Sequence, residues 1–317
     1  MIRNFLMFLC SLIVIASCTT SARTNQHNLA EYNIPVDSIR IRDPFVHYDK
    51  KRDLYFMPAT NNHKGFKMYI SPDLKNWKDI GPVFTPGTDF WGKTDFWAPD
   101  LYYYNGRYYI FYTCSAENGI RSVGILVSDT PDGQYVPLEN EPITPKDWMA
   151  LDGVLYLDDA GDPWHIYSHE WLQVGDGKVV VQKLSKDLKS VAGEPVTLFR
   201  ASEAPWNIEM TWQKTGRVTD GAYPVMINGK LYMIWSSWVM REKPYYTIGV
   251  AESETNKITG PWKQHPDPIT FDDGGHGMFF KTREGKLMIS YHAPNAGPER
   301  AIIRPLIVEN GVLKIIK

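Results

Sequence analysis

The sequence predicts an all-β protein, built as a five-bladed β-propeller. Beyond residue 36 the chain consists of short apolar runs separated by Gly, Asn, Asp and Pro turns, with no convincing stretch of helical period. Many of these runs form pairs joined by tight turns such as Asn105-Gly106 and Asn228-Gly229, which are typical of β-hairpins. The hairpins also recur at a regular spacing, which is the signature of a repeat architecture.

The repeat consists of five segments that start with an acidic or polar residue and lead into a hairpin. They read "RDPFVHYDKKRDLYFM", "APDLYYYNGRYYIFYT", "LDGVLYLDDAGDPWHIYS", "TDGAYPVMINGKLYMIWSS" and "GHGMFFKTREGKLMISYH". We take their leading positions as Asp43, Asp100, Asp152, Asp220 and His276, which are 57, 52, 68 and 56 residues apart. Most units continue with two further strands, so four strands per unit in five units predict five blades. A β-sandwich is the structural alternative, but it predicts no repeat.

The N-terminus is predicted to be separate from the fold. An arginine is followed by an apolar stretch that is short for a membrane span, so residues 1–17 are expected to be an export signal. Ile15-Ala16-Ser17-Cys18 resembles the bacterial lipobox, which implies lipidation of Cys18 and a membrane-anchored, exported protein. Ordinary cleavage near Ser21-Ala22 is the alternative. Residues 18–36 are expected to be a tether, and residues 37–317 the propeller.

Composition narrows the class of partner. The chain has 317 residues, of which 43% are hydrophobic, enough for a large core. Its 34 Lys and Arg balance 36 Asp and Glu, with no basic stripe, so no nucleic-acid partner is expected. The 11 Trp and 18 Tyr suit an uncharged partner such as a carbohydrate. After loss of the signal and lipidation, Cys114 is left alone, and its apolar surroundings predict a buried core thiol.

The leading residues of the five units are candidates for a site. The innermost strand of each propeller blade lines the central channel, so its first residues converge on one mouth. A single aspartate there is ordinarily a turn or cap residue, but several in one place raise each other's pKa and cost stability. Glycoside hydrolysis needs such a group: one ionised carboxylate and one carboxylic acid kept protonated.

Aromatic residues near these positions are candidates for stacking on sugar rings, with packing between blades as the alternative for each. The candidates before Asp100 and before Asp220 are Trp91, Phe96, Trp97, Trp206 and Trp212.

Several motifs together resemble glycoside hydrolase family 43. They are Arg42-Asp43-Pro44-Phe45, "FWAPD" at 96–100, "LDGVLYLDDAGDPW" at 151–164 and "GGHG" at 274–277. The resemblance runs from about residue 38 to the C-terminus and implies a five-bladed propeller and an inverting glycosidase, largely active on α-L-arabinofuranosyl or β-D-xylosyl linkages.

The resemblance also implies roles for individual residues. Asp43 is implied as the general base and Asp152 as the modulator of the acid's pKa. His276 resembles the channel histidine, which in many members lies near a central metal ion, often calcium, or near a water cluster. No cofactor is expected to be required, and a structural calcium or sodium ion in the central channel is the optional expectation. Trp97, Asp100, Trp206 and Arg300 are expected to bind the substrate.

The general acid is where this chain departs from the family pattern. Most members carry a Glu at the start of the fourth blade, whereas this chain has Asp220, which is one methylene shorter. Glu203, in "SEAPW", and Glu209, in "NIEMTW", lie in the preceding loop and are the alternatives. The altered acid also motivates a second hypothesis, a catalytically inactive sugar-binding propeller of a glycan-capture system.

Overall fold

The structure is a computed structural model that describes residues 28–316 except His63 and Asn310. The expected signal peptide, Cys18 and residues 18–27 of the expected tether therefore lie outside the described residues. The tether was expected to run to residue 36, but Ile34 pairs with Trp77 on the outer edge of the first sheet. The propeller fold thus begins a few residues before position 37.

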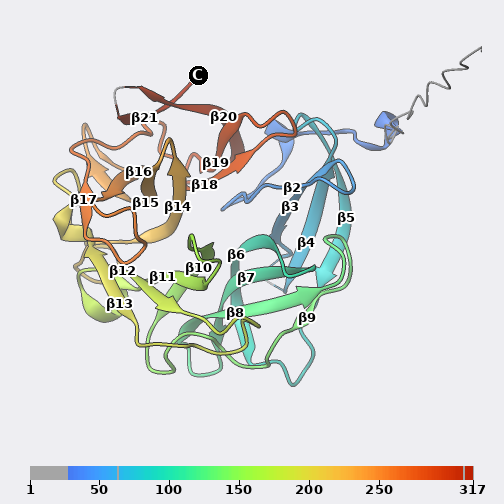
Figure 1. The fold of residues 1–317 in the computed structure, drawn as a ribbon, viewed down its shortest axis with the longest axis horizontal. Helices are drawn as coiled ribbons and strands as arrows, with labels where there is room; N and C mark the ends of the chain where they lie inside the picture. The colour runs from blue at the N-terminus through green and yellow to red at the C-terminus, as the bar shows by residue number, and fades with distance from the viewer. Residues whose placement is uncertain (1–27, 63, 310, 317) are drawn as a thin grey trace, which may run out of the picture.

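Five antiparallel sheets are arranged around a central axis, which confirms the predicted five-bladed propeller (Figure 1). In every sheet the strands follow one another outward from the axis in chain order, with β1 added at the outer edge of blade 1. Blade 1 contains β1 (Ile34–Pro35), β2 (His47–Asp49), β3 (Leu54–Thr60), β4 (Phe66–Ser71) and β5 (Asn76–Phe84). Blade 2 contains β6 (Gly92–Tyr104), β7 (Arg107–Ala116), β8 (Arg121–Ser128) and β9 (Val136–Pro137).

The remaining three blades have four strands each. Blade 3 contains β10 (Ala150–Leu157), β11 (Pro163–His169), β12 (Lys178–Lys183) and β13 (Val196–Arg200). Blade 4 contains β14 (Asp220–Ile227), β15 (Lys230–Met240), β16 (Pro244–Ser253) and β17 (Trp262–Gln264). Blade 5 contains β18 (Gly275–Lys281), β19 (Leu287–Ala293), β20 (Arg300–Glu309) and β21 (Val312–Ile315). Helices are short: η1 (Leu29–Glu31), η2 (Val36–Ser38), α1 (Trp171–Val174) and η3 (Ala201–Glu203).

The core lies between neighbouring blades, where alternate strand residues of facing sheets interdigitate. Trp77, Tyr112, Tyr167 and Trp235 are among the largest side chains that are fully buried. Cys114 is also fully buried and free, as predicted. The ring closes where the Arg40 backbone bridges to Arg300 in blade 5.

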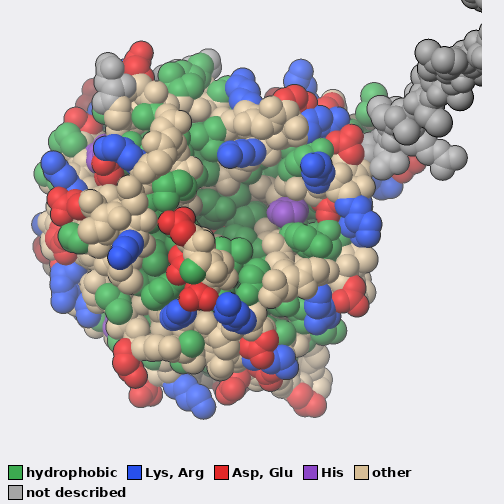
Figure 2. Space-filling view, viewed as in Figure 1, with side chains coloured by type: hydrophobic (Ala, Val, Ile, Leu, Met, Phe, Trp, Pro, Cys, Tyr) green, Lys and Arg blue, Asp and Glu red, His purple; other side chains and the backbone are tan. Residues whose placement is uncertain are grey.

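Figure 2 shows one face of the ring, hollowed at its centre with hydrophobic side chains on the walls, and with acidic and basic side chains interspersed around the rim. Within residues 28–316, apart from the two positions left out, no helix has the length and apolar character needed to cross a bilayer.

Candidate active site

A repeated backbone feature aims side chains at one mouth of the channel. Each inner strand, or the segment that leads into it, has one residue in the left-handed region, where φ lies between 43° and 60°. These residues are Asp43, Ala98, Asp152, Gly221 and His276. In blades 2 to 5 the pairing of the inner strand with its neighbour shifts register at this residue, which identifies a β-bulge. A β-bulge changes the direction of the side chains next to it. Here the bulges direct side chains toward one mouth of the central channel.

The bulges correct the predicted repeat alignment. Asp43, Asp152 and His276 are equivalent, but the equivalent residue in blade 2 is Ala98 and that in blade 4 is Gly221. Asp100 comes two residues later and lines a small cavity deeper in the channel, beside Phe45. Burial raises the pKa of Asp100 well above its ordinary value, and its carboxylate accepts a hydrogen bond from the Tyr102 hydroxyl at 3.1 Å. The expected contact between Asp100 and substrate is therefore not supported by this geometry.

Asp43, Asp152 and Asp220 meet in a pocket of about 750 Å³ at the bulged ends of the inner strands. Trp97 and Tyr246 also line this pocket. All three carboxyl side chains are largely buried, which strengthens the interactions between them. The sequence correctly predicted that these carboxyls converge.

Asp43 is held in its ionised form by basic neighbours. Its Oδ1 lies 3.2 Å from Nδ1 of His276 and 3.3 Å from Nδ1 of His292. Burial alone would raise its pKa, but His276, His292 and Arg42 together hold the pKa well below the ordinary value. Arg42 is itself fixed, because it donates hydrogen bonds to Asn295 and Glu299. An ionised carboxylate in this position can act as a base.

Asp152 has the opposite electrostatic character. It accepts a hydrogen bond from the backbone N–H of Gly221 at 2.9 Å, and its own N–H donates to Thr113. Burial and the nearby charge of Asp43 raise the pKa of Asp152 well above its ordinary value. The pKa of Asp152 therefore depends on the charge of Asp43, and Asp152 in turn raises the pKa of Asp220.

Asp220 is suited to hold a proton near neutral pH. Burial and the proximity of Asp152 raise its pKa to about 7, against the effect of a hydrogen bond from the Tyr246 hydroxyl. A carboxyl with this pKa remains largely protonated in mildly acidic solution. The pocket thus contains one carboxylate that stays ionised and one carboxylic acid, the combination that general acid–base chemistry requires.

His276 is tied into this group. Its backbone N–H donates to Ser236 at 2.7 Å, and its Nδ1 faces Asp43 and, at 3.7 Å, Asp152. Within the described part of the chain, no three His, Cys, Asp or Glu side chains are grouped so as to hold a metal ion. Calcium takes six to eight oxygen ligands, so these residues alone do not form a calcium site. An ion beside His276 stays a prediction.

Comparison with known proteins identifies the family. Residues 32–309 match the family model described as glycosyl hydrolases family 43. The chain belongs to this family. The resemblance found in the sequence motifs is thereby confirmed.

Several family 43 relatives are informative. An endo-arabinase structure from Bacteroides thetaiotaomicron is 48% identical, with a TM-score of 0.86, over 88% of this chain and 99% of that chain. The extracellular exo-α-(1→5)-L-arabinofuranosidase of Cellvibrio japonicus and the extracellular endo-α-(1→5)-L-arabinanase 1 of Bacillus subtilis are each 25% identical. These matches cover 71% and 67% of this chain but only 66% and 64% of the relatives' lengths.

The alternative acids of this family 43 chain lie away from the pocket. Glu203 is exposed at the third position of η3, and its carboxylate accepts a hydrogen bond at 2.9 Å from the backbone N–H of Arg200, the N-cap residue of that helix. Glu209 is exposed as well. The "SEAPW" letters match the family motif, but the segment folds as a surface turn, so Asp220 alone of the three acids lines the pocket.

Two of the predicted substrate contacts are also placed elsewhere. Trp206 is buried against Trp235, with ring centroids 4.9 Å apart, and occupies the space above Gly249. Arg300 lies on β20 and donates to the Glu299 carbonyl, outside the set of pocket residues. The arginines that line the pocket are Arg40 and Arg42. Arg42 stands next to Asp43 in the quoted motif and could have been proposed on that ground.

Trp97 lines the pocket, and its contact with substrate stays a prediction. The guanidinium of Arg121 lies 5.3 Å from its ring centroid, and Arg121 forms a two-point ion pair with the buried Glu170. The indole is thus held in place by a cation that is itself fixed. Tyr246 was missed, because it reaches Asp220 from a strand two places further out in the blade.

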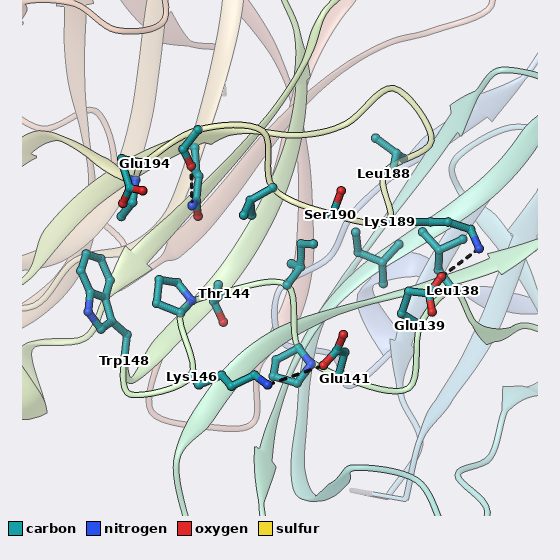
Figure 3. A pocket seen from close by; sticks show the side chains of 18 residues that line it. Leu138, Glu139, Glu141, Thr144, Lys146, Trp148, Leu188, Lys189, Ser190 and Glu194 are labelled. Atoms are coloured by element: carbon teal, nitrogen blue, oxygen red, sulfur yellow. Dashed lines mark hydrogen bonds and ion pairs between the residues drawn. The ribbon is translucent and has the colours of Figure 1, made fainter.

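A second cavity, of about 590 Å³, lies between segments 138–148 and 188–195 (Figure 3). Of its acidic residues, Glu139 and Glu141 form ion pairs with Lys189 and Lys146, at 2.8 and 3.9 Å. None of the three converging aspartates lines it. The candidate active site is therefore the pocket at the channel mouth.

Proposed function

We propose that the protein is an inverting glycosidase that hydrolyses arabinose-containing polysaccharide, with Asp43 as general base and Asp220 as general acid. The observation that carries the proposal is the opposite protonation of two carboxyls in one pocket. Asp43 is kept ionised by His276 and His292, while burial and Asp152 keep Asp220 protonated up to a pH of about 7.

In this mechanism Asp43 takes a proton from a water molecule whose oxygen attacks the anomeric carbon. The bond from that carbon to the leaving oxygen breaks as Asp220 gives its proton to the leaving oxygen. Asp152 raises the pKa of Asp220 and so keeps this acid protonated. The carboxyls of base and acid are expected roughly 6.5–9.5 Å apart, which leaves room for the water. No step uses a metal ion.

The substrate class is supported by the relatives. The endo-arabinase structure at 48% identity and the two curated relatives are named for action on arabinan. Another relative, from Bacteroides ovatus, is named xylosidase/arabinosidase and is 25% identical. We therefore rank α-L-arabinofuranosyl linkages first and β-D-xylosyl linkages second.

The test is hydrolysis of arabinan, xylan and aryl glycosides of both sugars by the wild type, Asp43→Asn and Asp220→Asn. Glu203→Gln is the matched control, because it removes an exposed carboxyl outside the pocket. We expect activity that is lost in both aspartate variants, retained in the control, and accompanied by inversion at the anomeric carbon in NMR spectra of the products. A product of retained configuration would refute the inverting mechanism. Glycan binding without any turnover would support the capture-protein alternative.

We further propose that the protein is exported and anchored to a membrane through lipid on Cys18. The motif around Cys18 and the word extracellular in the names of two relatives support export. Mass spectrometry of the mature N-terminus tests this proposal, since an unmodified first residue would contradict it.

A further inference from the structure

Three tryptophans form a row that ends at the candidate acid. Trp212 lies in the loop 204–219 and is 57% exposed. Its ring centroid is 4.5 Å from that of Trp238, in an edge-to-face arrangement, and 6.4 Å from that of Trp171. Trp238 continues the row, because its ring centroid lies 5.6 Å from that of Tyr246. The Tyr246 hydroxyl in turn donates to Asp220.

The loop that carries Trp212 is fixed to β15, the strand that pairs with the inner strand β14. The Ile208 N–H donates to the Trp238 carbonyl, and the Ser237 hydroxyl donates to the Val218 carbonyl. The loop then leads through Thr219 directly into Asp220. This loop also accounts for the longest spacing in the repeat, since bulge residues Asp152 and Gly221 are 69 apart, against 54 or 55 elsewhere. The extra chain length of this unit therefore carries an exposed aromatic ring that is connected to the acid through Trp238 and Tyr246.

The position of the row relative to Asp220 indicates which part of a substrate it meets. A general acid contacts the leaving oxygen, so surfaces beyond the acid face the leaving portion of the chain. Sugar rings present apolar C–H faces, and a large exposed indole offers a rigid apolar surface at low cost in side-chain entropy. Asp43, held by His276 and His292, activates the attacking water. Tyr246, whose ring also stacks on that of His292 at 5.8 Å, stands between this base and the tryptophans.

We propose that Trp212 and Trp238 form a binding surface for sugar residues on the leaving-group side of the scissile bond. This rests on the proposed function and deepens it, because the natural substrate is then a polymer or long oligosaccharide that extends past the acid. Binding energy from those remote residues lowers the barrier for long substrates and contributes nothing for a substrate with a small leaving group. The surface is thus a determinant of specificity for chain length.

The variants are Trp212→Leu and Trp212→Phe. Leucine keeps apolar contact with Trp171 and Trp238 but lacks a flat face, whereas phenylalanine keeps a flat ring. Tyr103→Ala is the matched control, because Tyr103 is 56% exposed and lies near the end of β6, six residues after the pocket residue Trp97. The measurements are kcat/KM on linear arabinan and on 4-nitrophenyl α-L-arabinofuranoside, together with thermal unfolding of each variant.

We expect Trp212→Leu to lower kcat/KM on arabinan by about 10-fold or more and to change hydrolysis of the aryl glycoside by less than about threefold. Trp212→Phe should recover part of the loss, and Tyr103→Ala should change neither value. An equal loss on both substrates, or no loss on either, would overturn the proposal.

A second measurement separates this proposal from the proposed function. The affinity of Asp220→Asn for linear arabino-oligosaccharides of increasing length is measured calorimetrically, with and without Trp212→Leu. We expect affinity to rise with length only when Trp212 is present. If the wild type shows no hydrolysis but this length dependence holds, the glycosidase function fails and the tryptophan surface stands. If affinity is independent of Trp212 at every oligosaccharide length, the proposed tryptophan binding surface is refuted, whether or not the protein is active.

Discussion

The Tyr246 hydroxyl donates a hydrogen bond to Oδ2 of Asp220 at 2.9 Å. This bond favours the ionised form of Asp220, while burial and Asp152 favour the protonated form. The balance gives Asp220 a pKa of about 7 instead of a much higher value. Because an acid must release its proton during each turnover, Tyr246 also helps Asp220 to accept the negative charge that results.

The first prediction concerns the pH dependence of the wild type. Asp220 must be protonated, and it loses its proton as the pH rises through about 7. We expect kcat/KM to fall up to tenfold per pH unit above that value. Asp43 is ionised throughout the accessible range, so the acidic side of the profile should be flat down to about pH 5 if the enzyme stays folded. Initial rates on an aryl glycoside in constant ionic strength buffers measure this, and a rise above pH 7 would contradict it.

Tyr246→Phe should move the fall of kcat/KM at alkaline pH to a higher pH. Without the hydroxyl the ionised form of Asp220 loses a donor, so its pKa rises by about one unit, the shift that about 1.4 kcal/mol of hydrogen bonding produces. Tyr245→Phe is the control, because the buried Tyr245 hydroxyl has no hydrogen-bond partner among the described residues. A downward shift in Tyr246→Phe, or equal shifts in the two variants, would refute the assigned role.

Gly221→Ala should damage catalysis more than folding. A methyl group at Gly221 would lie 2.9 to 3.1 Å from atoms of the His276 ring and would push that ring away from Asp43. We expect kcat to fall by about 10- to 100-fold. Gly161→Ala is matched, because Gly161 also has positive φ but nothing within 4 Å of the added methyl group. Both variants should lose about 1 kcal/mol of stability, and equal activity in the two would contradict the steric argument.

Asp220→Asn should change how stability depends on pH. The folded pKa of Asp220 is about 7 and the unfolded value about 3.9, so between these values only the folded state keeps the proton. Stability from this group is therefore lost as the pH rises, by up to about 1.4 kcal/mol per unit. The free energy of unfolding of the variant, measured in urea, should therefore increase relative to that of the wild type between pH 5 and pH 8. A constant difference would show that Asp220 is not held protonated.

The fold was predictable because its determinants are local. Hairpin turns and strand composition recur in every unit, and the repeat is near 55 residues except for the longer step before blade 4, so the five blades could be counted from the sequence. The register was less accessible, since a bulge adds a residue with no polar signal: Ala98 and Gly221 occupy positions that the sequence assigned to Asp100 and Asp220.

The site was predictable where residues share the start of an inner strand, as Asp43, Asp152 and His276 do. Residues that reach the pocket from an outer strand of the sheet were not predictable, and Tyr246 on β16 is the example. Trp206 and Trp212 lie six residues apart in one loop, yet one is buried and the other exposed. Their environments depend on how that loop packs on β15 and β16, which the local pattern does not encode.

The most direct test of the central claim compares two leaving groups. The acid is needed for a poor leaving group and dispensable for a good one, whereas the base is needed for both. The measurement is kcat/KM of Asp220→Asn and Asp43→Asn on 4-methoxyphenyl and 2,4-dinitrophenyl α-L-arabinofuranosides, or on the corresponding β-D-xylosides if the panel selects xylose. We expect Asp220→Asn to lose about 100-fold or more on the first and less than about tenfold on the second, and Asp43→Asn to lose at least about 100-fold on both. Equal losses of Asp220→Asn on the two substrates would show that Asp220 is not the general acid.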